Sequence, residues 1–262
     1  QLEEYMNLEV GKYVVYEMDS LVFVNFNKDL VTVKYKAKDV VDALITDNEG
    51  RPSWRVIRYI RNYNSTDEAD WKPLTTYMVT PLAKSIETVE ENQRYIKLIL
   101  PVTEGYSWKG NAYIDPESFD PSYSIDSWDY VYENVNAPFS LENGPVIPNS
   151  VTVNQRDEIL GNPDNPYAYT IENLSKEVYA KGIGLIYKEF FHSEYQTFYD
   201  TYNCYFVRCV NNVCDTVTCP VNDYACELDK LAAGYTKYCR DTVLAESYYV
   251  GYGLRLKMID HN

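Results

Sequence analysis

Apolar and polar residues alternate along much of the chain. The clearest stretch is residues 31–37, where Val31, Val33, Tyr35 and Ala37 are separated by threonine and lysines. A period of two places successive side chains on opposite faces, as in a half-buried antiparallel strand. Comparable patterns, rich in β-branched and aromatic residues, predict strands at residues 53–62, 71–80, 83–89 and 94–102. A helix over residues 86–92 is the alternative, since no proline or glycine interrupts residues 82–100.

Two later stretches, residues 178–189 and 250–258, each predict one strand with a Gly-x-Gly sequence, at Gly182 and Gly184 and at Gly251 and Gly253. Glycine inside a strand indicates sharp curvature, which we favour, or close approach of a backbone or ligand. A nucleotide-binding loop is excluded, because the third glycine and the following helix are missing. The patterns together predict an antiparallel all-β meander of roughly 12 to 14 strands, folded as a barrel-like or strongly curved sheet.

All the cysteines lie close together near the C-terminal end of the chain. An even number in a short stretch predicts disulfides, with fifteen possible pairings for six cysteines. The alternative, a metal site, lacks a Cys-x2-Cys pair and a nearby histidine. We expect residues 191–247 to form a cysteine-rich subdomain with one short helix within 224–238, inserted into a β domain of residues 1–190 and 248–262. The cysteines are Cys204, Cys209, Cys214, Cys219, Cys226 and Cys239.

The charge of the chain excludes several classes of partner. Asp and Glu outnumber Lys and Arg by 39 to 24, which gives a net charge of −15. Nucleic-acid binding requires clustered basic residues, and docking on anionic lipid requires the same. Arg51, Arg55, Arg58 and Arg61 fall in or beside one predicted strand. We interpret them as a solvated face of cross-strand ion pairs, with an anion-binding patch as the alternative.

Residues that carry catalytic chemistry are scarce. The chain has two histidines, and no Gly-x-Ser-x-Gly sequence that would present a serine nucleophile. For His192 we expect a structural or solvent-facing role. Cysteine nucleophiles are unexpected if all the cysteines are paired. We therefore predict a protein that is not an enzyme and holds no cofactor and no metal.

The composition changes between residues 103 and 148, where aromatic residues are interleaved with acids and prolines. Aromatic rings beside carboxylates and amides are typical of sugar recognition, because the apolar face of a sugar stacks on a ring while its hydroxyls bind polar groups. The favoured alternative is that these aromatics cover one end of a barrel. A calcium site within Asp115–Asp129 lacks the ligand spacing and central glycine of an EF-hand. The candidate binding residues are Trp108, Tyr113, Tyr123, Trp128 and Tyr130.

Several short phrases of the chain resemble a group of uncharacterised secreted lipoproteins from Bacteroides-type bacteria. They are residues 11–20, 89–98, 108–111, 179–189 and 251–262. Such proteins have no established activity, so the resemblance implies no functional residues. It implies an exported protein tethered to the outer membrane, or exposed at the cell surface, through a lipid-bearing cysteine just upstream of Gln1. Without that anchor we expect a periplasmic protein.

These observations lead to two hypotheses of function. The first is a non-catalytic binding protein of the cell envelope that recognises a glycan or a protein partner. The second is a carrier that holds a lipid-like or small apolar ligand inside a β-barrel. The carrier hypothesis predicts an apolar pocket beside Gly182 and Gly253, where the Gly-x-Gly strands would leave room above the sheet.

Overall fold

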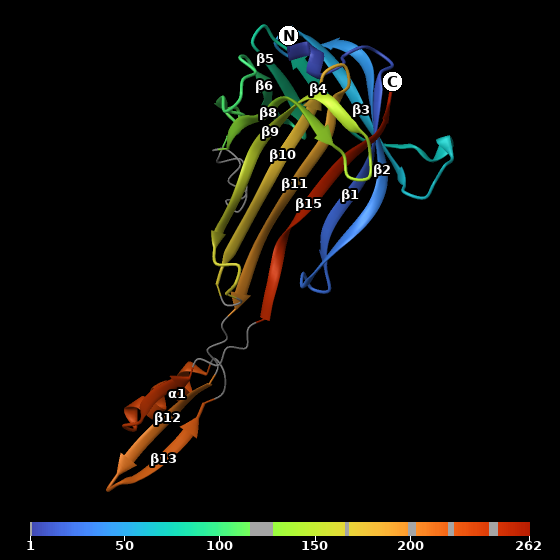
Figure 1. Ribbon diagram of the computed structural model, residues 1–262. Helices are drawn as coiled ribbons and strands as arrows, with labels where there is room; N and C mark the ends of the chain where they lie inside the picture. The colour runs from blue at the N-terminus through green and yellow to red at the C-terminus, as the bar shows by residue number, and fades with distance from the viewer. Residues whose placement is uncertain (1, 116–127, 166–167, 199–202, 220–222, 241–245) are drawn as a thin grey trace.

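The computed structural model describes residues 2–115, 128–165, 168–198, 203–219, 223–240 and 246–262. Twelve antiparallel strands form one strongly curved, nearly closed barrel-like sheet (Figure 1), which confirms the predicted fold class. The strand order is β6-β5-β4-β3-β2-β1-β15-β11-β10-β9-β8-β7. The strands are β1 (Tyr13–Val24), β2 (Asp29–Thr46), β3 (Pro52–Asn62), β4 (Lys72–Pro81), β5 (Ser85–Glu90), β6 (Gln93–Ile99), β7 (Ser107–Lys109), β8 (Asp129–Ser140), β9 (Val146–Gly161), β10 (Thr170–Ala180), β11 (Gly184–Phe198) and β15 (Glu246–His261).

The sheet consists of two meanders joined through the C-terminal strand. Strands β1 to β6 pair in sequence order, as do β7 to β11, and β15 lies between β1 and β11 (Figure 1). Met18 of β1 pairs with Leu256 of β15, and Lys188 of β11 pairs with the same residue from the other side. The N-terminal and C-terminal strands are therefore neighbours at the centre of the sheet.

The first residues of the chain close one end of the barrel. Helix η1 (Leu2–Tyr5) is a 3-10 turn whose Leu2 and Tyr5 are buried against the core. The Gly182 amide donates a hydrogen bond of 2.7 Å to the Glu4 carbonyl, which ties this turn to the loop between β10 and β11. A second short 3-10 helix, η2 (Glu68–Asp70), lies in the connection between β3 and β4.

The two edge strands of the sheet meet through side chains rather than a regular ladder. The Trp108 Nε1 donates to the Ile96 carbonyl at 2.8 Å. The Tyr132 hydroxyl accepts from the Ile99 amide at 2.7 Å and donates to the Ile99 carbonyl at 2.8 Å. One backbone hydrogen bond, from the Ile96 amide to the Gly110 carbonyl at 2.8 Å, completes the contact. We call these contacts between β6 and the β7–β8 edge the seam.

The Gly-x-Gly stretches differ from the prediction in two respects. Residues 178–189 form a hairpin rather than one strand, because β10 ends at Ala180 and β11 begins at Gly184. In β15 the glycines allow close approach of neighbouring groups: a Cβ at Gly251 would lie 2.0 Å from the His192 carbonyl oxygen, and one at Gly253 would lie 2.9 Å from Leu21 Cδ1. The alternative helix over residues 86–92 is wrong, since β5 and β6 form a hairpin there.

The cysteine-rich part forms a sheet of its own. Strands β12 (Asn203–Val210), β13 (Val213–Thr218) and β14 (Thr236–Arg240) pair in the order β13-β12-β14, and α1 (Tyr224–Ala232) lies between β13 and β14 in the chain. The predicted disulfides and short helix are confirmed, with pairs Cys204–Cys239, Cys209–Cys214 and Cys219–Cys226. The main sheet extends to Phe198 and resumes at Glu246, so it includes residues that the sequence analysis assigned to the subdomain.

Among the described residues, no helix has the length and apolar character that crossing a membrane requires.

Candidate functional site

Six charged side chains from six different strands face the interior of the barrel. Each occupies an inward position in the alternation of its strand, as Arg58 does two residues after buried Val56. Three are acids and three are bases, so the set is balanced in charge. The six are Asp39 of β2, Arg58 of β3, Glu90 of β5, Lys97 of β6, Glu177 of β10 and Lys188 of β11.

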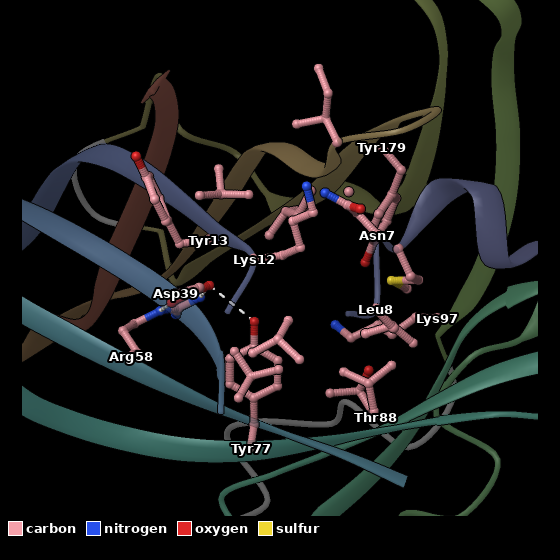
Figure 2. A pocket seen from close by; sticks show the side chains of 18 of the residues that line it. Asn7, Leu8, Lys12, Tyr13, Asp39, Arg58, Tyr77, Thr88, Lys97 and Tyr179 are labelled. Carbon is pink, nitrogen blue, oxygen red and sulfur yellow. Dashed lines mark hydrogen bonds and ion pairs between the residues drawn. The ribbon is translucent and has the colours of Figure 1, made fainter. Parts of the chain in front are cut away.

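One end of this set is a tightly bonded group around Asp39. The Arg58 guanidinium donates to both carboxylate oxygens of Asp39 at 2.6 Å. The Tyr77 hydroxyl donates to Asp39 Oδ2 at 3.0 Å, and the Arg58 guanidinium lies 5.6 Å from the centre of the Tyr77 ring (Figure 2). Burial, followed by the charge of Asp39, raises the pKa of Tyr77 well above its ordinary value. These contacts satisfy a pair that would otherwise be costly to bury.

The other end is a group around Glu177, which is fully buried. The Lys97 ammonium lies 2.7 Å from Glu177 Oε1, while Gln155 and Tyr179 donate to Oε2 at 3.0 and 2.6 Å. Burial alone would raise the pKa of Glu177, but the charges of Lys97 and Lys188 and these hydrogen bonds lower it to about 2. The carboxyl is therefore ionised at neutral pH.

Between these groups lie Glu90 and Lys188, whose contacts are longer. The Lys188 ammonium is 3.7 Å from Glu90 Oε2 and 3.5 Å from Glu177 Oε1. The Arg58 guanidinium is 3.9 Å from Glu90 Oε1. Burial would lower the pKa of Lys188, but the carboxylates of Glu90 and Glu177 raise it. The charge of Lys188 lowers the pKa of Glu90. Both groups are charged at neutral pH.

A cavity of about 90 Å³ lies on the η1 side of the charged residues, and we call it the upper cavity. Its lining includes Lys12, Tyr13, Asp39, Arg58, Tyr77 and Lys97 (Figure 2). The apolar part of its wall comes from the segment after η1 and from several strands. These apolar residues are Met6, Leu8, Val14, Val41, Val56, Val79, Ile183 and Leu185.

A second cavity, of about 160 Å³, has a row of aromatic rings along its wall, and we call it the aromatic cavity. The rings of Trp128 and Phe190 have centroids 6.4 Å apart, and those of Phe190 and Tyr252 are 5.2 Å apart. Tyr95 and Tyr130 add two hydroxyl groups, and burial raises the pKa of Tyr95 to about 12, so its hydroxyl stays protonated. The polar wall consists of Asn111, Gln155, Ser175 and Glu91 together with four charged residues that also line the upper cavity: Glu90, Lys97, Glu177 and Lys188.

The predicted binding residues have three different environments. Trp128 and Tyr130 line the aromatic cavity and are only 5% and 2% exposed, so they do not form the exposed face that stacking on a surface glycan would need. Trp108 is buried in the seam. Tyr113 is exposed on the outer surface, where its hydroxyl donates to Glu87. Tyr123 lies outside the described residues.

The structure places the four arginines of residues 51–61 in different environments, and it buries His192. Arg55 pairs with Asp42 on the neighbouring strand β2, as the prediction of cross-strand ion pairs expected. Arg51 instead pairs with Asp47 in the turn before β3, and Arg61 pairs with Glu68 of η2. Arg58 is buried, which corrects the prediction of a solvated face for this residue. His192 is buried, and its Nδ1 lies 2.7 Å from Asn173 Oδ1. No group of three or more His, Cys, Asp or Glu residues in the described part could hold a metal ion; the calcium candidate falls partly outside that part.

The sequence analysis missed Phe190, Tyr252 and the interior charges. A signal for Arg58 existed, because it alternates in phase with apolar Trp54 and Val56. Lys188 is likewise in phase with Phe190, two residues later. Charged residues in phase with apolar ones indicate a buried network rather than a solvated face.

The chain was compared with protein-family models, with curated proteins and with solved structures, and none of the three comparisons found a match.

Proposed function

We propose that this is a non-catalytic binding protein of the cell envelope whose aromatic cavity holds a small hydroxyl-rich ligand, such as one sugar unit of a glycan. The proposal rests on the row of rings formed by Trp128, Phe190 and Tyr252 beside carboxylate and amide groups in one cavity. Aromatic faces stack on the apolar face of a sugar ring, and the polar groups bind its hydroxyls.

The size of the cavity supports a small ligand. Pockets for drug-sized ligands usually enclose about 300–1,000 Å³. The aromatic cavity encloses about 160 Å³. A single sugar unit therefore suits it better than a long acyl chain, and the charged residues on its wall also oppose an apolar chain.

The cellular address is part of the same proposal. Three disulfides indicate an oxidising environment outside the cytoplasm. We propose the outer membrane or cell surface, with attachment through an N-terminal lipid. Labelling of intact host cells with a membrane-impermeant reagent tests this address, and labelling only after cell disruption would contradict surface exposure.

Truncation of the aromatic wall tests the binding function. We expect Trp128→Ala to weaken glycan binding by about 10-fold or more, because removing a buried aromatic anchor of an interface typically costs about 2 kcal/mol or more. A glycan array would identify a ligand and calorimetry would measure its affinity. Tyr113→Ala is the control, since Tyr113 lies on the outer surface.

Two results would contradict this function. One is a folded Trp128→Ala protein that binds the glycan as tightly as the wild type. The other is a wild-type protein that binds no saccharide on the array. If the wild type binds no saccharide but captures a specific protein partner, the ligand of this envelope protein is a protein and not a glycan.

A second candidate is the carrier of a small apolar ligand, which the apolar wall of the upper cavity favours. This cavity is bordered by Gly184; Gly182 and Gly253 do not line it, contrary to the expected position. The Asp39–Arg58 pair is part of its lining, so an amphipathic ligand fits better than a hydrocarbon. Native mass spectrometry of the purified protein would detect such a ligand, and a mass equal to the polypeptide alone would count against it.

A further inference from the structure

Glu90 and Lys188 differ from the other four interior charges in their hydrogen bonding. Asp39, Arg58, Lys97 and Glu177 all take part in contacts of 2.6 or 2.7 Å. The contacts of Lys188 begin at 3.5 Å and those of Glu90 at 3.7 Å. Hydrogen bonds between N–H donors and oxygen are usually about 2.7–3.2 Å long. Within the described part of the chain, these two groups attract each other but make no short hydrogen bond.

Donor and acceptor positions that lack a close partner are costly for charged groups that are mostly buried, such as the Lys188 ammonium and the Glu90 carboxylate. The side chains of Lys188 and Glu90 are 15% and 22% exposed, so bulk water reaches them only partly. An ammonium has three donors and a carboxylate has about four acceptor positions. Groups at this separation can both hydrogen-bond to a third polar group that lies beside them, such as a water molecule or a ligand hydroxyl. The pair is therefore suited to receive a ligand that both accepts and donates hydrogen bonds.

The pair also faces the proposed sugar site. Glu90 and Lys188 both line the aromatic cavity, and Phe190 follows Lys188 by two residues on β11, which places both side chains on the same face of the strand. A sugar ring stacked along the aromatic row would thus present its hydroxyl edge to the pair.

We infer that Glu90 and Lys188 determine specificity by binding two neighbouring hydroxyl groups of a neutral sugar, one donating to Glu90 and the other accepting from Lys188. This inference rests on the proposed function. The ligand is neutral because the six interior charges already balance, three acids against three bases, and Glu91, the further acid on the cavity wall, is exposed to solvent. A uronic acid or an amino sugar would bring an additional buried charge, which is costly without a partner of its own.

A double variant tests the pair without leaving a buried charge. In Glu90→Gln with Lys188→Met, Arg58 keeps Asp39 and Glu177 keeps Lys97, so we expect a folded barrel. The probe is the best-binding neutral methyl glycoside, together with its monodeoxy analogues and the matching uronic acid and amino sugar. The control is Lys176→Met, which removes an ammonium paired with Glu189 and 38% exposed.

We expect the double variant to bind the neutral glycoside roughly 10- to 100-fold more weakly, since hydrogen bonds to charged groups are worth about 1.5–3 kcal/mol. Lys176→Met should bind like the wild type. Removal of either of two adjacent hydroxyls from the ligand should cause a similar loss, and the uronic acid and amino sugar should bind more weakly than the neutral glycoside.

Different failures have different meanings. If Trp128→Ala loses glycan binding while the folded double variant retains it, the sugar site is supported, but the specificity role assigned to Glu90 and Lys188 is wrong. Tighter binding of the uronic acid or amino sugar than of the neutral glycoside would also overturn the inference. If the wild type binds no saccharide, the proposed function fails, and the inference fails with it.

Discussion

Single inward-facing charges are tolerated in this barrel because each finds partners on other strands. Lys97 and Glu177 are 80 residues apart in the chain and 2.7 Å apart in space. Burial of either one alone would be strongly unfavourable, whereas the pair with its surrounding hydrogen bonds is not. The network thus makes the position of each strand depend on its neighbours across the barrel.

Removal of one member of the Lys97–Glu177 pair should show how far the stability of the barrel depends on this network. We expect Lys97→Met to lower the free energy of unfolding by about 3–5 kcal/mol, because Glu177 then keeps, among the described residues, only the longer contact with Lys188. Lys34→Met is a matched control: the Lys34–Glu17 pair is 2.8 Å long, but Lys34 is 47% exposed. Such surface pairs usually contribute about 1 kcal/mol or less. Denaturant unfolding measures both variants, and equal losses would contradict the buried role of Lys97.

At the scale of elements, the seam decides whether the curved sheet behaves as a closed unit. Within the described residues, one backbone hydrogen bond joins strand β6 to the β7–β8 edge, so the side chains of Trp108 and Tyr132 carry much of the contact. Tyr132 satisfies both the amide and the carbonyl of Ile99 with a single hydroxyl. Its ring also packs against Trp108, with centroids 4.5 Å apart.

Loss of that hydroxyl should loosen the seam locally. We expect Tyr132→Phe to cost about 1–3 kcal/mol, since two backbone groups of Ile99 lose their partner while the ring is kept. Hydrogen exchange of the Ile99 amide should become faster. Tyr106→Phe is the control, because Tyr106 packs against the same core cluster and the described residues include no hydrogen-bond partner for its hydroxyl. Unchanged exchange at Ile99 in Tyr132→Phe would show that the seam does not depend on this contact.

At the scale of the whole molecule, carboxylates with lowered pKa values should make the barrel sensitive to acid. The pKa of Glu177 is about 2, and the hydrogen bond from Lys34, followed by contacts with Lys257, lowers that of Glu17 to about 2 despite partial burial. An unfolded glutamate has a pKa of about 4.3. A group whose pKa is lower in the folded state stabilises the fold above the unfolded value, and this stability is lost as pH falls.

We therefore expect constant stability between about pH 6 and pH 5, followed by a steep decrease between about pH 4.5 and pH 2. The contribution of Glu177 to this decrease is on the order of 3 kcal/mol. Thermal unfolding measured across this range would test the expectation. A melting temperature that does not change down to pH 2 would mean that these carboxylates titrate alike in the folded and unfolded protein.

The properties that the sequence determined by itself are local ones. Alternation within residues 31–37 or 53–62 depends only on neighbours in the chain, so the strands and the all-β class could be predicted. The spacing of the cysteines likewise indicated disulfides, and the composition of residues 224–238 indicated a short helix. These patterns also placed Arg58 in phase with apolar residues, although the sequence interpretation assigned it to a solvated face.

Only the tertiary structure decided what lies inside the barrel. Alternation divides a strand into two faces, but it does not say which strands become neighbours, and the insertion of β15 between β1 and β11 brings Tyr252 next to Phe190. Trp128 joins them from a third part of the chain, and Lys97 meets Glu177 across the interior. The site therefore depends on how the whole sheet curves and closes, because most of its residues lie far apart in the chain and become neighbours only when distant strands are brought together.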